Sequence, residues 1–293
     1  MHFLIDLDSA IFKAGCANET SCYMVYNHNG IPVADFQYKK DADKFAEEAS
    51  FDAVVEKVKE AGPLHHSIAN LRNIVDGILR HPRLTSYEIF IGGKGNFRYD
   101  IYPEYKSNRK AEDRPIHEDK LRQYLVKFYK AKLVNGQEAD DEVSILSTGR
   151  TDVVIASIDK DLNNTPGWHY NYDTKELYFV TDDDANLNFY RQLLMGDSTD
   201  GITGIKGVGK IAAESILPEA LTPEEMCAIV WDEYASRGYT YEYFVLQGRL
   251  LWMRRERNEM WEPPMTVPEG LSVSPAEEQP TQQSTDVQSV EEE

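Results

Sequence analysis

The stretch DVVIASIDKD, residues 152–161, joins a run of apolar residues to two aspartates two positions apart. A short apolar run rich in Val and Ile is typical of a buried strand. HFLIDL at residues 2–7 and YEIFI at residues 87–91 have the same character, and the first also carries an aspartate near its end. We therefore expect three buried strands with acidic side chains at the ends of two of them.

Helical patterns separate these strands, at residues 45–61, 68–79 and 116–129. Strands that alternate with helices indicate an α/β fold with a mostly parallel central sheet. Ligands of such sheets collect at the carboxyl ends of the strands, where Asp6, Asp159 and Asp161 fall. Residues 23–33, with Asn29 and Gly30 at a turn, and residues 169–180 are expected to form two hairpins at the sheet edge.

The pattern changes after residue 182. Helices are expected at residues 187–195, 210–217, 223–237 and 241–257, which together form a smaller all-helical unit. From residue 262 the chain contains eight acidic residues and no Lys or Arg, in a background of Pro, Gln, Ser and Thr. Such a composition buries too little apolar surface to fold, so residues 262–293 are predicted to be a disordered acidic tail.

The composition excludes several classes of protein. The sequence contains no apolar run of 18 residues and no apolar segment of the secretory kind near its start, so we expect a cytoplasmic protein with no membrane partner. Three cysteines without a C-x-x-C pair argue against both a disulfide framework and a zinc knuckle. The net charge is −19, but the acids are concentrated in the tail and in one cluster, so DNA remains a candidate partner.

That cluster comes from four separate segments of the chain. QEADDE at residues 137–142 opens a helical pattern. The helix dipole would explain one or two acids in a first turn, but it does not explain acids at this density. Carboxylates without a supporting histidine or cysteine favour Mg²⁺ or Mn²⁺, and two ions would suit phosphodiester hydrolysis. The candidate metal ligands are Asp6, Glu138, Asp140, Asp141, Asp159, Asp161, Asp197 and Asp200.

The segment GIKGVGK, residues 204–210, directly follows the last two of these aspartates. Its glycines allow backbone N–H groups to turn outward, which suits a phosphate. A plain surface turn is the alternative interpretation.

In this order, the motifs resemble those of the flap endonuclease and 5′–3′ exonuclease family, especially its bacteriophage members. The resemblance covers roughly residues 3–261. It implies a PIN-like 5′-nuclease catalytic domain over residues 1–182 with an arch at about 94–130. It also implies a helical DNA-binding subdomain over residues 183–261, with a helix-three-turn-helix (helix-hairpin-helix) element that binds K⁺.

Residues 94–110 are basic in this acidic chain, with five Lys or Arg and two acidic residues. Cations interleaved with aromatic rings suit a single strand, although a basic helix with packed tyrosines is the alternative. The resemblance assigns catalytic roles to Lys106 and Arg109. The candidate DNA-binding residues are Lys94, Arg98, Tyr105, Lys110, Gly204, Lys206, Gly207, Gly209 and Lys210.

The resemblance implies a monomer that cuts DNA 5′ ends, flaps, duplexes with a single-stranded arm or RNA–DNA hybrids, in replication or primer removal. The acidic tail would contact a replication protein. One departure is Gly93, where the family usually carries an aspartate; Asp8 or Asp100 could act in its place. Two alternatives stay open: a catalytically weakened DNA-structure-binding protein and a PIN-type ribonuclease.

Overall fold

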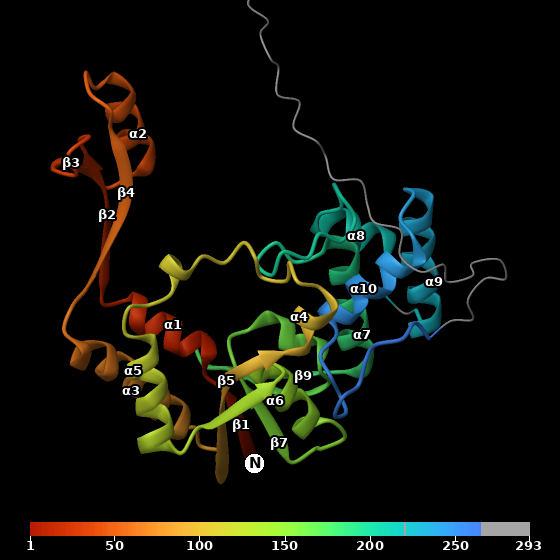
Figure 1. Ribbon diagram of the computed structural model, residues 1–293. Coiled ribbons are helices and arrows are strands. Elements are labelled where there is room, and N and C mark those ends of the chain that lie inside the picture. The colour runs from red at the N-terminus through yellow and green to blue at the C-terminus, as the bar shows by residue number, and fades with distance from the viewer. Residues whose placement is uncertain (220, 265–293) are drawn as a thin grey trace, which may run out of the picture.

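The computed structural model describes residues 1–219 and 221–264. Its centre is a six-stranded sheet (Figure 1). The strands, in spatial order, are β6 (Lys132–Gly136), β5 (Ser86–Asn96), β1 (His2–Asp6), β7 (Val153–Ala156), β8 (Gly167–Asn171) and β9 (Glu176–Val180). The first five strands are parallel and β9 is antiparallel to β8. This confirms the mostly parallel α/β fold, and the second expected hairpin, β8–β9, lies at the sheet edge.

Strand β1 lies in the middle of the sheet because both of its faces are apolar. Phe3 and Ile5 contribute to the core under α1 (Asp8–Cys16), α3 (Leu64–Leu79) and α5 (Glu118–Tyr124). Leu4 contributes to the opposite core, under α6 (Ala139–Ser147). Helices therefore cover both faces, as a parallel sheet requires. The short helices η1 (Ala111–Asp113), η2 (Leu125–Tyr129) and η3 (Lys160–Asn164) complete this part of the chain.

A second, three-stranded sheet forms an arm that projects from the body (Figure 1). It consists of β2 (Glu19–Tyr26), β3 (Pro32–Phe36) and β4 (Val54–Ala61), packed with α2 (Lys39–Glu48). The β2–β3 hairpin confirms the expected turn at Gly30, whose φ is +70°. The hairpin belongs to this arm, however, and not to the edge of the main sheet as expected.

The helix expected at residues 45–61 is wrong. Helix α2 ends at Glu48, and residues 54–61 form β4, which pairs with all eight residues of β2 in unbroken register. Three valines in β4 favour an extended chain. Pairing with a neighbouring strand therefore outweighed the helical spacing of the apolar residues.

The C-terminal helices have their own hydrophobic core, which includes Phe189, Tyr234 and Phe244. They are α7 (Asp182–Met195), α8 (Lys210–Ile216), α9 (Pro223–Ser236) and α10 (Tyr241–Leu251). Helices α7, α9 and α10 each begin after a threonine whose side chain caps the first turn. The predicted helices are confirmed, except that α10 ends six residues early.

Arg98 explains this early end. It lies on α4 (Phe97–Ile101), and its guanidinium donates hydrogen bonds to the backbone carbonyls of Leu250 and Trp252.

In the described part of the chain, the helices are all too short or too polar to cross a bilayer. The predicted disordered tail lies outside the described residues from 265 onward.

Candidate active site

Three aspartates gather at the carboxyl ends of β1 and β7. Asp6, the last residue of β1, is 3% exposed and accepts hydrogen bonds from the Ser157 hydroxyl and the Asp8 backbone N–H. Asp159 caps η3 by accepting from the N–H of Asp161 at 2.9 Å. Parallel pairing of β1 with β7 brings these residues together, as the sequence predicted.

Burial and mutual repulsion disfavour the charged form of these groups. Burial, then the charge of Asp8, raises the pKa of Asp6 to about 7. Burial, then the charges of Asp159 and Asp197, raises the pKa of Asp161 to about 7. Such shifts are expected where several carboxylates share one site.

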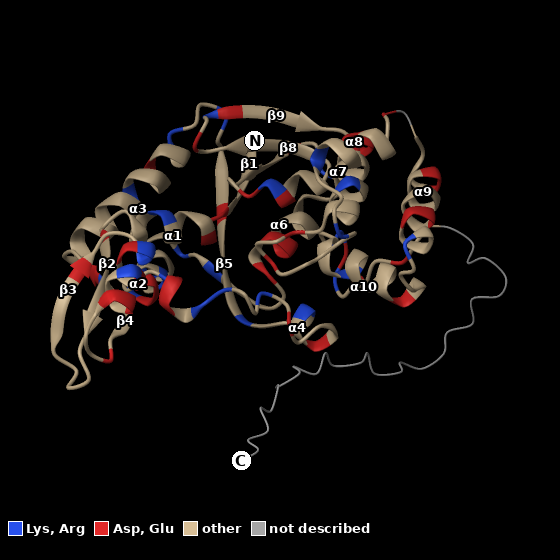
Figure 2. Cartoon of the chain, turned by 90° about the horizontal axis from the view of Figure 1, so that it is seen from above, with Lys and Arg blue, Asp and Glu red and all other residues tan. Residues whose placement is uncertain are grey.

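A second group of carboxylates lies at the start of α6, in the middle of the molecule between β5 and α7 (Figure 2). Oxygen atoms of Glu138, Asp140 and Asp141 lie within 4.8 Å of one another. Burial, then the charge of Glu138, raises the pKa of Asp140 well above its usual value. Burial would also raise the pKa of Glu138, but Lys106 and Arg98 hold it below its ordinary range.

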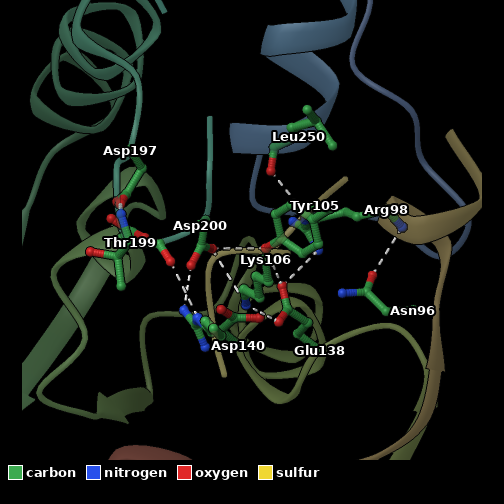
Figure 3. A network of polar contacts seen from close by, with 12 residues as sticks. Asn96, Arg98, Tyr105, Lys106, Glu138, Asp140, Asp197, Thr199, Asp200 and Leu250 are labelled. Carbon is green, nitrogen blue, oxygen red and sulfur yellow. Dashed lines mark hydrogen bonds and ion pairs between the residues drawn. The ribbon is translucent and has the colours of Figure 1, made fainter. Parts of the chain in front are cut away.

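The last two aspartates come from the loop after α7. Asp197 accepts hydrogen bonds from the Thr199 N–H at 2.7 Å and from the Lys160 ammonium at 3.1 Å. Asp200 forms ion pairs with Lys106 and Arg109. Figure 3 shows Asp200 and Glu138 facing each other across the Lys106 side chain.

Lys106 and Arg109, to which the resemblance assigned catalytic roles, both pair with carboxylates of the site. Lys106 is 13% exposed and pairs with both Glu138 and Asp200, whereas Arg109 is half exposed. The backbone N–H of Lys106 donates to the Asp200 carbonyl, and Asn108 donates to the Ser198 carbonyl. The segment around Lys106 is thus fastened directly to the loop that carries Asp197 and Asp200.

Three residues predicted to bind DNA are buried and need correction. Arg98 is fully buried and makes a bidentate ion pair with Asp141. Tyr105 is 2% exposed, and its hydroxyl lies 2.8 Å from both Glu138 and Asp200. Gly204 is buried, and its N–H donates to the Gln247 side chain. Arg98 also occupies both oxygens of Asp141, a predicted metal ligand.

The other predicted DNA-binding residues are exposed: Lys94, Lys110, Lys206, Gly207, Gly209 and Lys210. Gly207 has φ of +85° and nothing within 4 Å of the position of a Cβ atom, so the hairpin presents bare backbone to the surface. The loop that leads to it is tight. A Cβ on Gly196 would lie 2.3 Å from the Ile202 carbonyl oxygen, and a Cβ on Gly204 would lie 2.3 Å from the Gly196 nitrogen.

Several site residues escaped the sequence analysis. Gln192 of α7 donates to Asp161, and Lys160 pairs with Asp197. Arg122 of α5 forms an ion pair with Asp8 at 3.0 Å. A helical pattern predicts which face of α5 or α7 is polar, but not which polar residue reaches the site.

Together these features define a class of protein: an α/β protein with an all-carboxylate site at the carboxyl ends of its parallel strands, flanked by a glycine hairpin. The donor set fits Mg²⁺ or Mn²⁺, because the oxygens are hard ligands and because burial, then mutual repulsion, raises the pKa of Asp6 and Asp161, which bound cations would lower.

Comparison with known proteins gives the same resemblance to exonucleases and flap endonucleases that the motifs predicted. No protein-family model matches the chain. It is 28% identical to an exonuclease of Escherichia phage T7 over 128 residues, which are 41% of this chain and 43% of that protein. It is 25% identical to the flap endonuclease Xni of a Shewanella strain over 154 residues, which are 47% of this chain and 59% of that protein. Both matches span less than two thirds of the relative's length.

Among solved structures, the chain is similar to the bacteriophage T5 D15 flap endonuclease in a complex with DNA and metal ions. The identity is 14% and the TM-score 0.48, over 86% of this chain and 89% of that one. The predicted resemblance to exonucleases and flap endonucleases is thus confirmed by the relatives that the sequence matches.

Proposed function

We propose that the chain is a metal-dependent 5′ nuclease that hydrolyses phosphodiester bonds at DNA 5′ ends, flaps or RNA–DNA hybrids. One observation carries the proposal: Lys106 pairs both with Glu138 at the start of α6 and with Asp200 of the loop after α7, and Arg109 also pairs with Asp200, so carboxylates from two separate segments meet at these cations. The names of the relatives, exonuclease and flap endonuclease, support this reaction. A role in replication or primer removal is part of the proposal.

Asp6, Glu138, Asp140 and Asp159 would hold one ion, and Asp161, Asp197 and Asp200 a second. When bound, the two ions would stabilise the attacking and leaving oxygens of the phosphodiester. Tyr105 supports this arrangement, because its hydroxyl lies 2.8 Å from carboxylates of both groups. It would hold Glu138 and Asp200 in fixed orientations.

Lys106 and Arg109 would bind the oxygens of the phosphate that is cut. Both cations already lie against the carboxylates, so a phosphodiester that enters the site meets them at once. Positive charge held there offsets the negative charge that develops in the transition state. Arg109 is half exposed and is free to meet DNA first, whereas Lys106 is mostly buried.

The exposed hairpin around Gly207 would hold the backbone of the duplex without reading its sequence. Outward N–H groups and the two flanking lysines suit phosphates, and a K⁺ ion at the hairpin is part of the same proposal. The exposed cations Lys94 and Lys110 would guide the single-stranded arm toward Lys106.

The test compares cleavage of 5′-labelled flap, duplex and single-stranded RNA substrates in Mg²⁺ and in EDTA. We expect Mg²⁺-dependent cleavage of the DNA substrates, and at least tenfold slower cleavage by Lys106→Met. Lys175→Met is a matched control, because Lys175 is a lysine with a similarly positive φ in the β8–β9 turn. DNA binding without cleavage would favour the weakened binding protein, and cleavage of RNA alone the PIN-type ribonuclease.

A further inference from the structure

The end of β5 differs from the other strand ends at the site, because it carries Gly92 and Gly93 and no acid. Gly93 leaves no room for one. A Cβ there would lie 2.5 Å from the Val134 carbonyl oxygen and 2.4 Å from the Asn135 side-chain oxygen. Since the first of these is backbone of the neighbouring strand β6, a side chain at residue 93 would force the two strands apart.

Asp8 fills the space above the neighbouring glycine. Its carboxylate accepts the Gly92 backbone N–H at 2.9 Å, and a Cβ on Gly92 would lie 2.9 Å from the same oxygen. Any side chain at residue 92 would therefore displace Asp8. The glycine at the end of β5 thus makes room for a carboxylate that comes from the start of α1.

The position of Asp8 connects it to the carboxylates of the site. Its backbone N–H donates to Asp6 at 3.1 Å, so the two acids are held side by side after β1. Asp8 thus lies beside the acid of β1 and over Gly92 of the neighbouring strand β5.

One oxygen of Asp8 still has unused capacity to accept. Its Oδ1 atom is buried and forms an ion pair with the Arg122 guanidinium at 3.0 Å. Because each carboxylate oxygen has two lone pairs, this contact leaves one lone pair of Oδ1 for a cation. Arg122 is itself fixed by Glu118 and by the Gly92 carbonyl.

We propose that Asp8 is an additional ligand of the divalent cation held by Asp6. This inference rests on the proposed function, because it names one more residue of the same metal site. The competing interpretation is that Asp8 only anchors Arg122 to the end of β5. The two interpretations differ in what removal of each partner does to cation affinity.

The test measures Mn²⁺ binding by electron paramagnetic resonance in the full-length protein without DNA. Asp8→Asn keeps an oxygen that can accept the Gly92 N–H but loses the charge, and we expect its Mn²⁺ affinity to fall at least about tenfold. Arg122→Gln should keep or increase the affinity, because it removes a competing cation. Asp232→Asn, a variant of an exposed aspartate on α9, is the matched control and should bind as the wild type does.

Thermal unfolding in EDTA separates folding from binding. If Asp8→Asn and Arg122→Gln lower the melting temperature alike while both bind Mn²⁺ as tightly as the wild type, Asp8 is an anchor and the inference is overturned. If Asp8→Asn does not fold, Asp8→Ser takes its place, with the same expected loss of affinity. A wild-type protein that binds no Mn²⁺ would instead refute the proposed metal-dependent function.

Discussion

The buried ion pair between Arg98 and Asp141 gives the sharpest prediction for stability. Both side chains are fully buried, and the guanidinium also donates to the carbonyls of Leu250 and Trp252. Arg98→Met keeps much of the apolar volume of the side chain but leaves the Asp141 carboxylate without its cation. It also removes the hydrogen bonds that join β5 and α4 to the end of α10.

The expected loss follows from these contacts. Breaking a buried ion pair on one side costs about 3–5 kcal/mol, because an uncompensated charge stays buried. Two backbone carbonyls that lose their donors add roughly 1 kcal/mol or more. We therefore expect a loss of about 5 kcal/mol, and a melting temperature lower by roughly 10–20 °C for a chain of this size.

The measurement is urea unfolding followed by circular dichroism in EDTA. Arg150→Met is the matched control, because Arg150 makes an exposed ion pair with Asp152 and should unfold close to wild type. Arg98→Met/Asp141→Leu should regain most of the loss, since replacing both partners removes the unpaired charge. If Arg98→Met unfolds within 1 kcal/mol of the control, the pair does not hold the two parts of the chain together.

Three further predictions concern the site and the pH dependence of folding. Asp159→Asn should slow cleavage about a hundredfold or more while duplex binding in EDTA stays unchanged; cleavage at the wild-type rate would contradict the ligand assignment. Gly207→Val should weaken duplex binding equally for all DNA sequences and flatten its salt dependence. Gly149→Val, at an equally open glycine with positive φ, is the control and should do neither. Weaker binding to one DNA sequence alone would argue against contacts to the phosphate backbone. Burial lowers the pKa of His169 from 6.5 to about 4, so between these pH values the unfolded chain binds a proton that the folded chain does not. The folded state should therefore lose about 3 kcal/mol of stability as the pH falls from 6.5 to 4. His169→Gln should reduce this dependence of the free energy of unfolding on pH, as measured by urea titrations.

The sequence predicted the parts of the fold in which local pattern and burial agree. The runs at residues 2–7, 87–91 and 152–158 are apolar on both faces, which only a covered parallel sheet accommodates, and they form β1, β5 and β7. The four C-terminal helices were also predicted, and threonine caps at the start of three of them agree with that prediction. The prediction for segment 54–61 failed because the spacing of its apolar residues suggested a helix, whereas its valines and the pairing with β2 favour a strand.

The candidate site was predictable in its acids but not in its cations. Carboxylates at strand ends follow from chain order, and Asp6, Asp159 and Asp161 meet as expected. Whether a basic residue faces solvent or the interior depends on tertiary packing. Arg98 and Lys94 are only four residues apart in one basic segment, yet one is fully buried and the other is exposed.

The tight loop between Gly196 and Gly204 has a consequence for where a substrate would be cut. Asp200 lies inside this loop, at the candidate metal ligands, and the exposed hairpin begins directly after it. Close backbone packing at both glycines, together with the hydrogen bond from Gly204 to Gln247, leaves the loop little freedom to lengthen or bend. The loop would therefore keep the hairpin and the candidate metal ligands at a fixed distance from each other. A duplex bound at the hairpin would then place the phosphate that is cut a constant number of nucleotides away, whatever the base sequence.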